Sequence, residues 1–166
     1  KITSIAADIK KAHNNTEEQI AAALQYVQRE VRYLGIEVGE NSHKPSAADE
    51  TLKRRYGDCK DKAVLLISLL RELQVKAYPA LVNTGLKKEL INSLPSISGF
   101  DHVIVQVIHN NKPYWLDPTR QYQYGSLKDI YQPNYDYALV INATSETLTP
   151  INPEQVESLY FVKETF

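Results

Sequence analysis

The sequence predicts an α+β domain whose helices come first and whose strands then form an antiparallel sheet. Apolar residues recur at helical spacing as far as residue 73, and from residue 75 onward they alternate with polar residues in short runs separated by turn signals. The chain has 166 residues, and a domain of that size buries roughly 70% of the surface that it exposes when unfolded. It therefore needs no disulfide or metal ion to hold it together.

Two helices are predicted in the first 33 residues. Apolar residues three or four positions apart over residues 2–12 predict the first helix. Thr16 is the expected N-cap of the second helix, and Gln19 completes a capping box with it. The apolar stripe behind them carries this helix to about Tyr33. The polar stretch 37–50, with a proline in it, predicts a surface loop.

A third helix is predicted to begin at Cys59, with Asp58 as its N-cap. Residues 63–73 are apolar almost all round, a pattern typical of a central, buried helix rather than a surface helix. The first predicted strand follows at 75–82. Pro79 within it favours an edge position or a bulge, because proline has no N–H to give to a neighbouring strand.

A β-hairpin is the clearest feature of the second half. Residues 101–108 alternate in polarity, Asn110–Asn111 is a turn signal, and 114–116 returns as the paired strand. Four further segments are predicted from local pattern: a loop at 84–99 with a short helix at 86–91 inside it, strands at 137–141 and 159–162, and a polar connection at 144–158.

The expected domain organisation is a single domain over residues 1–145, with residues 146–166 as a C-terminal extension that leads toward a further domain. The chain begins with Lys1 and contains no methionine. We interpret it as a segment of a longer protein, with other domains of that protein as neighbours.

Charge and hydropathy exclude several classes of function. The chain has 19 Lys and Arg against 20 Asp and Glu, so we expect no nucleic-acid partner bound through bulk positive charge. It has no run of about 18 apolar residues, so we expect no membrane span. A single cysteine rules out an internal disulfide.

Cys59 carries the strongest chemical signal. The first residue of a helix lies at the positive end of the macrodipole, which favours the thiolate form of a cysteine. The surrounding residues 53–62 contain five cations and two carboxylates, which act in the same direction. Gly57, two residues earlier, permits close approach of backbone or substrate. The alternative is an inert, buried cysteine at a helix start.

His102 and Asp117 are the expected partners of Cys59. If Asn110–Asn111 forms a two-residue turn, the register places His102 and Asp117 as diagonal neighbours on one face of the hairpin, about 7–8 Å apart at Cα. Asp117 would then orient His102, and His102 would accept the proton of Cys59, the arrangement of acyl-transfer enzymes. A slip of one residue would put the two on opposite faces. His102 would then be a structural residue at a strand start.

A zinc site is the alternative use of the same side chains, with His43 as a fourth ligand. Zinc sites are usually marked by a close pair of ligands such as C-x-x-C, and the sequence has none. We therefore expect no metal ion and no cofactor.

Three motifs occur in the same order as in the transglutaminase-like superfamily. The segment 55–59 before an apolar helix resembles the nucleophile segment of this family, 100–105 resembles its histidine strand, and 115–119 resembles its aspartate strand. Cys59 and His102 are 43 positions apart, and His102 and Asp117 are 15 apart. The likeness covers roughly residues 16–141.

Segments 33–37 and 57–63 are similar to a bacterial subgroup of this family. In that subgroup the domain usually follows an N-terminal β-rich domain of unknown function, in exported or periplasmic proteins. The resemblance therefore implies a periplasmic or exported location, which the residues themselves do not indicate.

The resemblance implies a papain-like fold, with the helix that begins at Cys59 packed on the antiparallel sheet. It also implies cysteine-dependent acyl transfer on peptide or carboxamide bonds of a peptide or protein substrate. The Cys59 backbone N–H and an upstream side chain, Tyr33 or alternatively Tyr56, would bind the oxyanion. Both tyrosines would otherwise simply line a cleft.

Three activities stay open under this resemblance. Hydrolysis by a protease or amidase is favoured. The alternatives are a protein-crosslinking transglutaminase and a module that keeps the fold but only binds a peptide or partner. Asp58 stands where animal transglutaminases have glutamine before the nucleophile, so the resemblance does not define the acyl acceptor.

Overall fold

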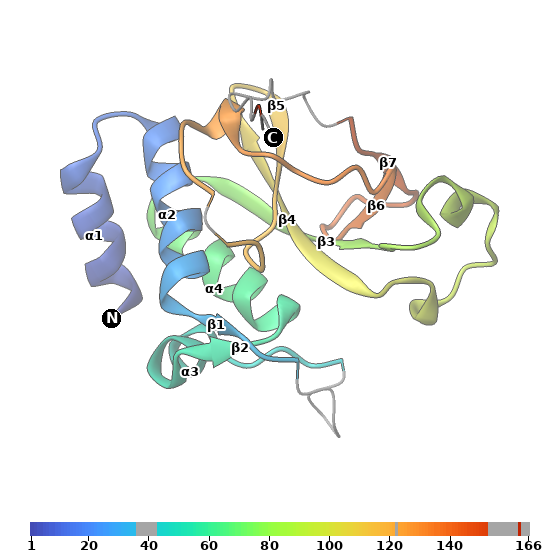
Figure 1. The fold of residues 1–166 in the computed structure, drawn as a ribbon, viewed down its shortest axis with the longest axis horizontal. Coiled ribbons are helices and arrows are strands. Elements are labelled where there is room, and N and C mark those ends of the chain that lie inside the picture. Colours follow the sequence, from blue (N-terminus) through green and yellow to red (C-terminus); the bar gives the residue numbers. More distant parts are fainter. Residues whose placement is uncertain (36–42, 122, 153–162, 164–166) are drawn as a thin grey trace.

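The computed structural model describes residues 1–35, 43–121, 123–152 and 163. In this part of the chain the helices come first and the sheet second, as predicted (Figure 1). Its α-helices are α1 (Ile2–Ala12), α2 (Thr16–Glu30), α3 (Ala48–Arg54) and α4 (Cys59–Glu72). The strands of its larger sheet are β3 (Lys76–Val82), β4 (His102–His109), β5 (Lys112–Leu116), β6 (Tyr137–Val140) and β7 (Thr149–Pro150).

The N-cap of α2 lies one residue earlier than predicted. Asn15, not Thr16, takes the extended conformation of a cap, and its side-chain oxygen accepts a hydrogen bond from the Glu18 N–H at 2.9 Å. Thr16 is the first helical residue. Either side chain can cap a helix, and the sequence pattern alone did not decide between two adjacent candidates.

The end of α2 also differs from the prediction. The helix stops at Glu30 because Val31 is already extended, and Tyr33 lies in the short strand β1 (Arg32–Tyr33). This strand pairs in parallel with β2 (Tyr56–Gly57) and places Tyr33 opposite Gly57. Two-residue strands show no alternation of polarity, so the sequence did not reveal this pairing.

Helix α3 begins within the stretch 37–50 that was predicted to be a loop, of which residues 36–42 lie outside the described residues. Its seven residues are too few for a clear apolar period. The signal that was present is charge: Asp49 and Glu50 occupy the first turn, and Lys53 and Arg54 the last turn. Both placements complement the helix macrodipole.

The predicted hairpin and its register are confirmed. Asn110 and Asn111 have φ values of 51° and 60°, as in the two-residue turns whose twist matches antiparallel strands. His109 pairs with Lys112, and the same register continues to Val105 opposite Leu116. The larger sheet has the strand order β5-β4-β3-β6-β7, and neighbouring strands in it run antiparallel.

Pro79 does not mark an edge strand, so that prediction is wrong. Strand β3 lies between β4 and β6. The Pro79 carbonyl accepts a hydrogen bond from the Ile141 N–H at 2.8 Å, one residue after β6 ends at Val140. The missing N–H of Pro79 therefore falls where the ladder with β6 ends, and a central strand tolerates it there.

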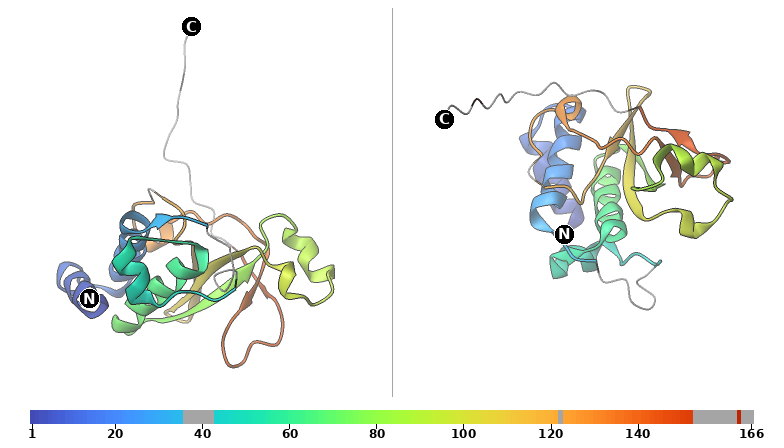
Figure 2. Two further views of the ribbon diagram at one scale, coloured as in Figure 1. Left: turned by 90° about the horizontal axis from the view of Figure 1, so that it is seen from below. Right: turned by 45° about the vertical axis from the view of Figure 1, so that its right-hand side comes forward.

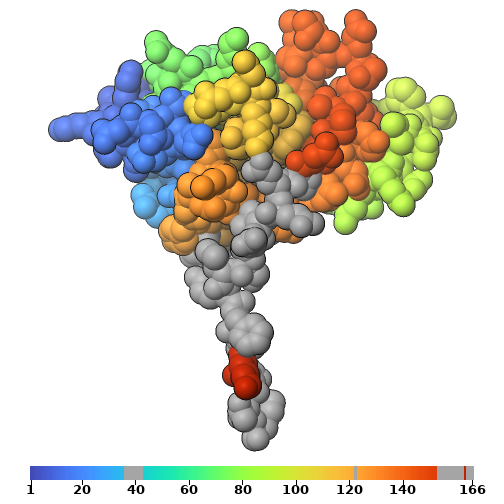
Figure 3. Space-filling model, turned by 90° about the horizontal axis from the view of Figure 1, so that it is seen from above, coloured from blue at the N-terminus to red at the C-terminus, as the bar shows by residue number. Residues whose placement is uncertain are grey.

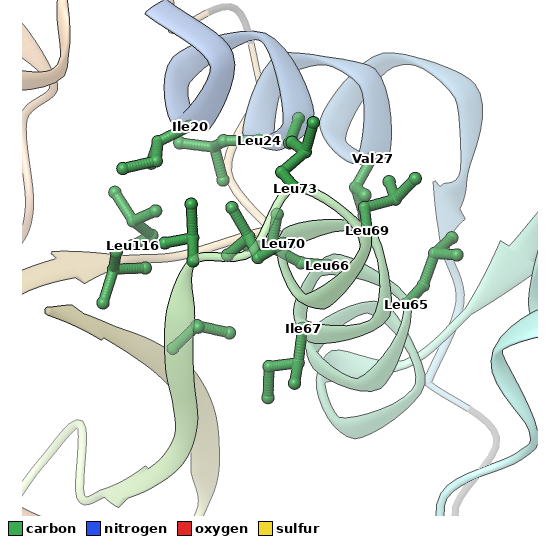
Figure 4. Close-up of a cluster of buried hydrophobic side chains, with 14 of the residues drawn as sticks. Ile20, Leu24, Val27, Leu65, Leu66, Ile67, Leu69, Leu70, Leu73 and Leu116 are labelled. Atoms are coloured by element: carbon green, nitrogen blue, oxygen red, sulfur yellow. The ribbon is translucent and has the colours of Figure 1, made fainter. Parts of the chain in front are cut away.

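Helix α4 is the centre of the main core, as predicted. Apolar side chains of α2, α4 and β5 meet there, and those labelled in Figure 4 are Ile20, Leu24, Val27, Leu65, Leu66, Ile67, Leu69, Leu70, Leu73 and Leu116. A second, smaller cluster includes Ala80, Ile104, Trp115 and Val140. Alternate residues of β4 enter the two clusters, so both faces of the sheet are covered.

The helices gather at one end of the molecule, and the connection between β3 and β4 lies at the other end (Figure 2). Seen from above, the β4–β5 hairpin lies between α1 and α2 on one side and β6 and β7 on the other (Figure 3). The connection between β3 and β4 contains the 3₁₀ helix η2 (Lys87–Asn92), close to the short helix predicted at 86–91.

The sheet continues past residue 145, because β7 pairs with β6 and Ile151 is buried in the smaller cluster. The predicted strand 159–162 lies outside the described residues. The division into residues 1–145 and 146–166 stays a prediction.

Candidate active site

Cys59 is held at the first turn of α4 by a tight cap. The Asp58 side chain accepts hydrogen bonds from the N–H groups of Lys60 and Asp61, and the Asp61 side chain accepts from the Asp58 N–H. This reciprocal capping box fixes the backbone on both sides of Cys59. The cysteine is a free thiol, with 7% of its surface exposed.

The hairpin register brings His102 and Asp117 together, as predicted. His102 is the first residue of β4, and Asp117 follows directly after β5. The Nε2 atom of His102 lies 2.9 Å from an Asp117 carboxylate oxygen. The Cys59 side chain also acts on the imidazole, because its hydrogen bonding and its charge both raise the pKa of His102. Three side chains from α4, β4 and the end of β5 thus form one connected chain.

The Asp117 carboxylate is fixed from its second oxygen as well. Thr119 donates to that oxygen from its backbone N–H at 2.9 Å and from its hydroxyl at 2.7 Å. The Gln28 side-chain amide of α2 donates to the Asp117 carbonyl at 3.0 Å. With 1% of its surface exposed, Asp117 has both carboxylate oxygens bonded and its backbone tied to α2.

The electrostatics of the pair favour a charged imidazole. Burial lowers the pKa of His102, but the hydrogen bonds and charges of Asp117 and Cys59 outweigh it and raise the pKa to about 10. Burial acts to raise the pKa of Asp117, but its hydrogen bonds to His102 and Thr119 and the His102 charge together lower it. Each partner therefore stabilises the ionised form of the other.

Tyr135 covers the imidazole from the side. Its ring meets His102 edge to face, with ring centroids 6.1 Å apart. Burial and the Asp117 charge raise the pKa of the Tyr135 hydroxyl to about 12. The phenol stays neutral under ordinary conditions and shields the His102–Asp117 pair from solvent.

Tyr33 and Tyr56 lie on the β1–β2 ribbon directly before Cys59, and both are partly exposed. Tyr33 is partnered with Gly57, so the two residues face the same side of the ribbon. A Cβ on Gly57 would lie 2.7 Å from the Asp61 Cβ of α4, so this side faces the start of α4. The Tyr56 ring contacts Arg54, whose guanidinium lies 5.0 Å from the ring centre and also pairs with Asp61 of α4.

The cations around Cys59 are mostly neutralised, which corrects the simple charge count made from the sequence. Arg54 pairs with Asp61, Lys60 with Asp58, and Arg55 with Glu30. Lys53 is exposed. Lys62 is the exception among the five, because it is completely buried and its ammonium donates to the Val31 carbonyl.

Sequence reasoning missed four residues that contact or influence this site: Gln28, Lys62, Thr119 and Tyr135. The pattern Asp-x-Thr after a strand was a usable signal for Thr119, because such a threonine folds back onto the carboxylate. Lys62 interrupts an otherwise apolar helix face, which was also readable. Nothing local marks Gln28 or Tyr135, whose contacts join distant segments.

In the described part of the chain, no group of three or more histidine, cysteine, aspartate or glutamate side chains is arranged to hold a metal ion. His43, the fourth ligand of the alternative zinc site, is exposed in a turn. No helix among the described residues is long and apolar enough to cross a membrane.

The family model described as the transglutaminase-like superfamily matches residues 3–124 of the chain. This range contains Cys59, His102 and Asp117. No curated protein matches the sequence.

Three solved structures share the fold. A candidate protease from Parabacteroides distasonis has a TM-score of 0.68 and 15% identity, over 93% of this chain and 28% of that chain. A candidate cysteine protease from Cytophaga hutchinsonii has a TM-score of 0.56 and 19% identity, over 72% of this chain and 37% of that chain. A protein described as a TGase has a TM-score of 0.52 and 15% identity, over 75% of this chain and 33% of that chain.

These likenesses confirm the predicted α+β, papain-like arrangement. The chain spans between 28% and 37% of the length of these three proteins. At such low identity the likeness extends to the fold and not to a particular reaction.

Proposed function

The chain belongs to the transglutaminase-like superfamily, and on this basis we propose that it is a cysteine-dependent acyl-transfer enzyme. Cys59 would be the nucleophile, His102 the proton carrier and Asp117 the residue that orients His102. The substrate would be a carboxamide or peptide bond of a peptide or protein.

The observation that carries the proposal is the His102 imidazole, whose Nε2 lies 2.9 Å from the Asp117 carboxylate and whose charged form the Cys59 side chain also favours. Nε2 is bound to the carboxylate, which leaves Nδ1 for the sulfur. An imidazole held in this way can take the thiol proton and remain charged, because Asp117 stabilises the imidazolium. The raised pKa of His102 agrees with this role.

The first half of the reaction forms a thioester. The Cys59 thiolate attacks the substrate carbonyl, and the C=O electron pair moves onto oxygen to give a tetrahedral oxyanion. When this intermediate collapses, the C–N bond breaks, and the His102 imidazolium gives its proton to the leaving amine. The acyl group is then bound to sulfur, and His102 is neutral and able to act as a base.

The second half of the reaction regenerates the free enzyme. Neutral His102 accepts a proton from the incoming water or amine as its oxygen or nitrogen attacks the thioester carbonyl. Collapse of the second tetrahedral intermediate breaks the C–S bond and returns the thiolate–imidazolium pair. Asp117 stays ionised throughout, since its pKa is lowered.

We propose that the Cys59 backbone N–H and the Tyr33 hydroxyl stabilise the oxyanion. The cap of α4 uses the N–H groups of Lys60 and Asp61, and the Cys59 N–H lies at the positive end of the same helix. Tyr33 pairs with Gly57, which packs directly against Asp61 of α4, whereas the Tyr56 ring is already in contact with Arg54. Tyr33 is therefore favoured over Tyr56.

Hydrolysis is the favoured outcome, which makes the protein a protease or amidase. Two of the three structural neighbours carry protease names, and water requires no second binding site. Crosslinking by a transglutaminase reaction remains the alternative, and it differs only in the acceptor.

A module that only binds a peptide or partner would have no use for this arrangement. Burial of an imidazole and a carboxylate from solvent costs free energy that apolar side chains of similar size would not cost. The site retains both groups, together with the thiol.

The proposal is tested by incubation with an activated ester, such as a p-nitrophenyl ester of an N-acylated amino acid, followed by intact-mass measurement. We expect transient addition of one acyl group at Cys59 and release of the free acid. Cys59→Ala provides the matched control without a nucleophile. Incorporation of an added amine into the product would show that the reaction is transamidation. Absence of both an acyl adduct and turnover would contradict the proposed enzymatic activity.

A further inference from the structure

We infer that Lys62 is the counter-ion of the candidate site: its buried ammonium offsets the negative charges of Asp117 and Cys59 and so favours the reactive thiolate. This inference rests on the proposed function and adds a positioning residue to it. Lys62 would not touch the substrate, and it would act through the charge state of Cys59.

Lys62 is placed for such a role. It lies on α4 three residues after Cys59, with no exposed surface at all. Its ammonium donates a hydrogen bond to the Val31 carbonyl at the end of α2. Lysine is rarely buried so completely, because removal of the ammonium from water is costly.

Burial lowers the pKa of Lys62, and the charge that opposes this lowering is that of Asp117. From α4 itself and from α3 and α2, the neighbouring charges are already paired: Asp58 with Lys60, Arg54 with Asp61, and Arg55 with Glu30. From β4, His102 faces Asp117 and Cys59. The remaining charged side chains of α1, β3 and α4 are exposed: Asp8, Lys10, Lys11, Lys76, Arg71 and Glu72.

A count of the buried charges explains why a cation is needed. In the reactive form, Cys59 and Asp117 each carry a negative charge and His102 a positive charge, so these three groups leave one negative charge in a buried site. A net buried charge is unfavourable in a medium of low dielectric constant. The Lys62 ammonium makes the group of four neutral.

The Lys62 ammonium stays charged where the reaction would run. Burial lowers its pKa, and the attraction of Asp117 only partly opposes this, to give a value of about 8. Lys62 is therefore protonated at pH 6 to 7, the range in which a free thiol is almost wholly un-ionised.

A purely structural role is the alternative, since a cation at the C-terminal end of α2 also satisfies the Val31 carbonyl. Two variants separate the roles. Lys62→Met removes both the charge and the donor, whereas Lys62→Gln removes the charge and keeps an N–H donor near the carbonyl. Lys53→Met removes a charge from an exposed lysine on α3 and serves as the matched control.

The measurement is the rate of Cys59 alkylation by iodoacetamide from pH 5 to 9, with circular dichroism to show that each variant is folded. We expect the midpoint of this profile to move up by about one pH unit in both Lys62 variants, equivalent to about tenfold slower alkylation at pH 6. Lys53→Met should keep the wild-type profile.

A folded Lys62→Gln protein with the wild-type profile would overturn the inference and leave the proposed function intact. A wild-type profile identical to that of free cysteine would overturn both. If neither Lys62 variant folds, NMR titration of ¹³Cε-labelled lysine compares wild type with Cys59→Ala. Coupling between two sites is reciprocal, so without the thiolate Lys62 should titrate at lower pH, and an unchanged titration would overturn the inference.

Discussion

His102 contacts both of the groups that decide its charge, and this is the feature from which the proposed chemistry follows. Asp117 lies 2.9 Å from one ring nitrogen, and both Asp117 and Cys59 favour the charged imidazole. The carboxylate is itself held by Thr119. The imidazole therefore has one orientation in which it can serve the thiol.

Asp117→Asn tests whether the carboxylate orients His102. Asparagine keeps an oxygen that can accept from Thr119 but cannot stabilise the imidazolium, and its amide favours the wrong tautomer. Loss of the carboxylate in a serine triad costs about 10⁴ in turnover. We expect a smaller loss here, about 10²- to 10³-fold, because a thiol needs less help from its base.

Single-turnover acylation of Cys59 measures this effect, and a melting curve shows that the variant is folded. The acylation rate should fall further in Cys59→Ala and in His102→Ala than in Asp117→Asn. A folded Asp117→Asn protein that is acylated at the wild-type rate would show that the reaction needs only Cys59 and His102.

Tyr33→Phe tests the oxyanion donor, with Tyr56→Phe as its matched control. Removal of one oxyanion donor typically costs about 10²- to 10³-fold in rate. We expect a loss of this size in acylation for Tyr33→Phe and little change for Tyr56→Phe, since Tyr56 faces Arg54 instead. Equal rates for the two variants would remove Tyr33 from the oxyanion site.

The stability contributed by His102 should depend on pH. Its pKa is raised from 6.5 to about 10 in the folded protein, so its contribution is fully present below pH 6.5 and is lost as the pH rises through 10. Urea unfolding of wild type and His102→Gln measures the difference. We expect the difference in unfolding free energy to be largest near pH 6 and to shrink by pH 10, and a constant difference would contradict the raised pKa.

At the scale of elements, the β1–β2 ribbon ties the end of α2 to the start of α4. Arg32 donates to the Arg55 carbonyl and Leu34 to the Gly57 carbonyl, each at 2.9 Å. These two hydrogen bonds fix the chain immediately before Cys59. Gly57 is needed at this point because the side chain of Asp61 packs directly against it.

Gly57→Ala tests this junction. A Cβ there would lie 2.7 Å from the Asp61 Cβ, so the ribbon and the first turn of α4 must move apart. We expect a loss of about 1–3 kcal/mol in unfolding free energy together with slower acylation of Cys59. Gly99→Ala is the control, because its Cβ would meet Leu90 at an ordinary 3.7 Å. Equal stability of the two variants would show that the contact at Gly57 is not limiting.

Elements with a strong local signal could be predicted from the sequence, and those without one could not. Helix α4 and the β4–β5 hairpin followed from apolar period, the Asp58 cap and the Asn110–Asn111 turn. Helix α3 and the β1–β2 ribbon were missed because each is too short to show a period. The edge position predicted from Pro79 was wrong because the place where β6 ends depends on tertiary pairing.

At the scale of the whole molecule, the site forms where the start of α4 meets the ends of two strands. The register of the hairpin could be derived from the sequence, and it brought His102 to Asp117 as predicted. The approach of Cys59 to His102 depends on how α4 packs across the sheet, which no local pattern encodes. Gln28 and Tyr135 were missed for the same reason.

The central claim is that the folded protein activates Cys59, and its alkylation at pH 6 tests this claim most directly. Native wild type, wild type unfolded in urea and native His102→Gln are treated with iodoacetamide, and intact mass follows the reaction of the single thiol. We predict that native wild type reacts at least about tenfold faster than the unfolded chain, since the start of the helix and His102 both favour the thiolate. The advantage should shrink in His102→Gln, which keeps the start of α4 but loses the imidazolium. A native thiol that reacts no faster than the unfolded one would contradict the catalytic account of this site.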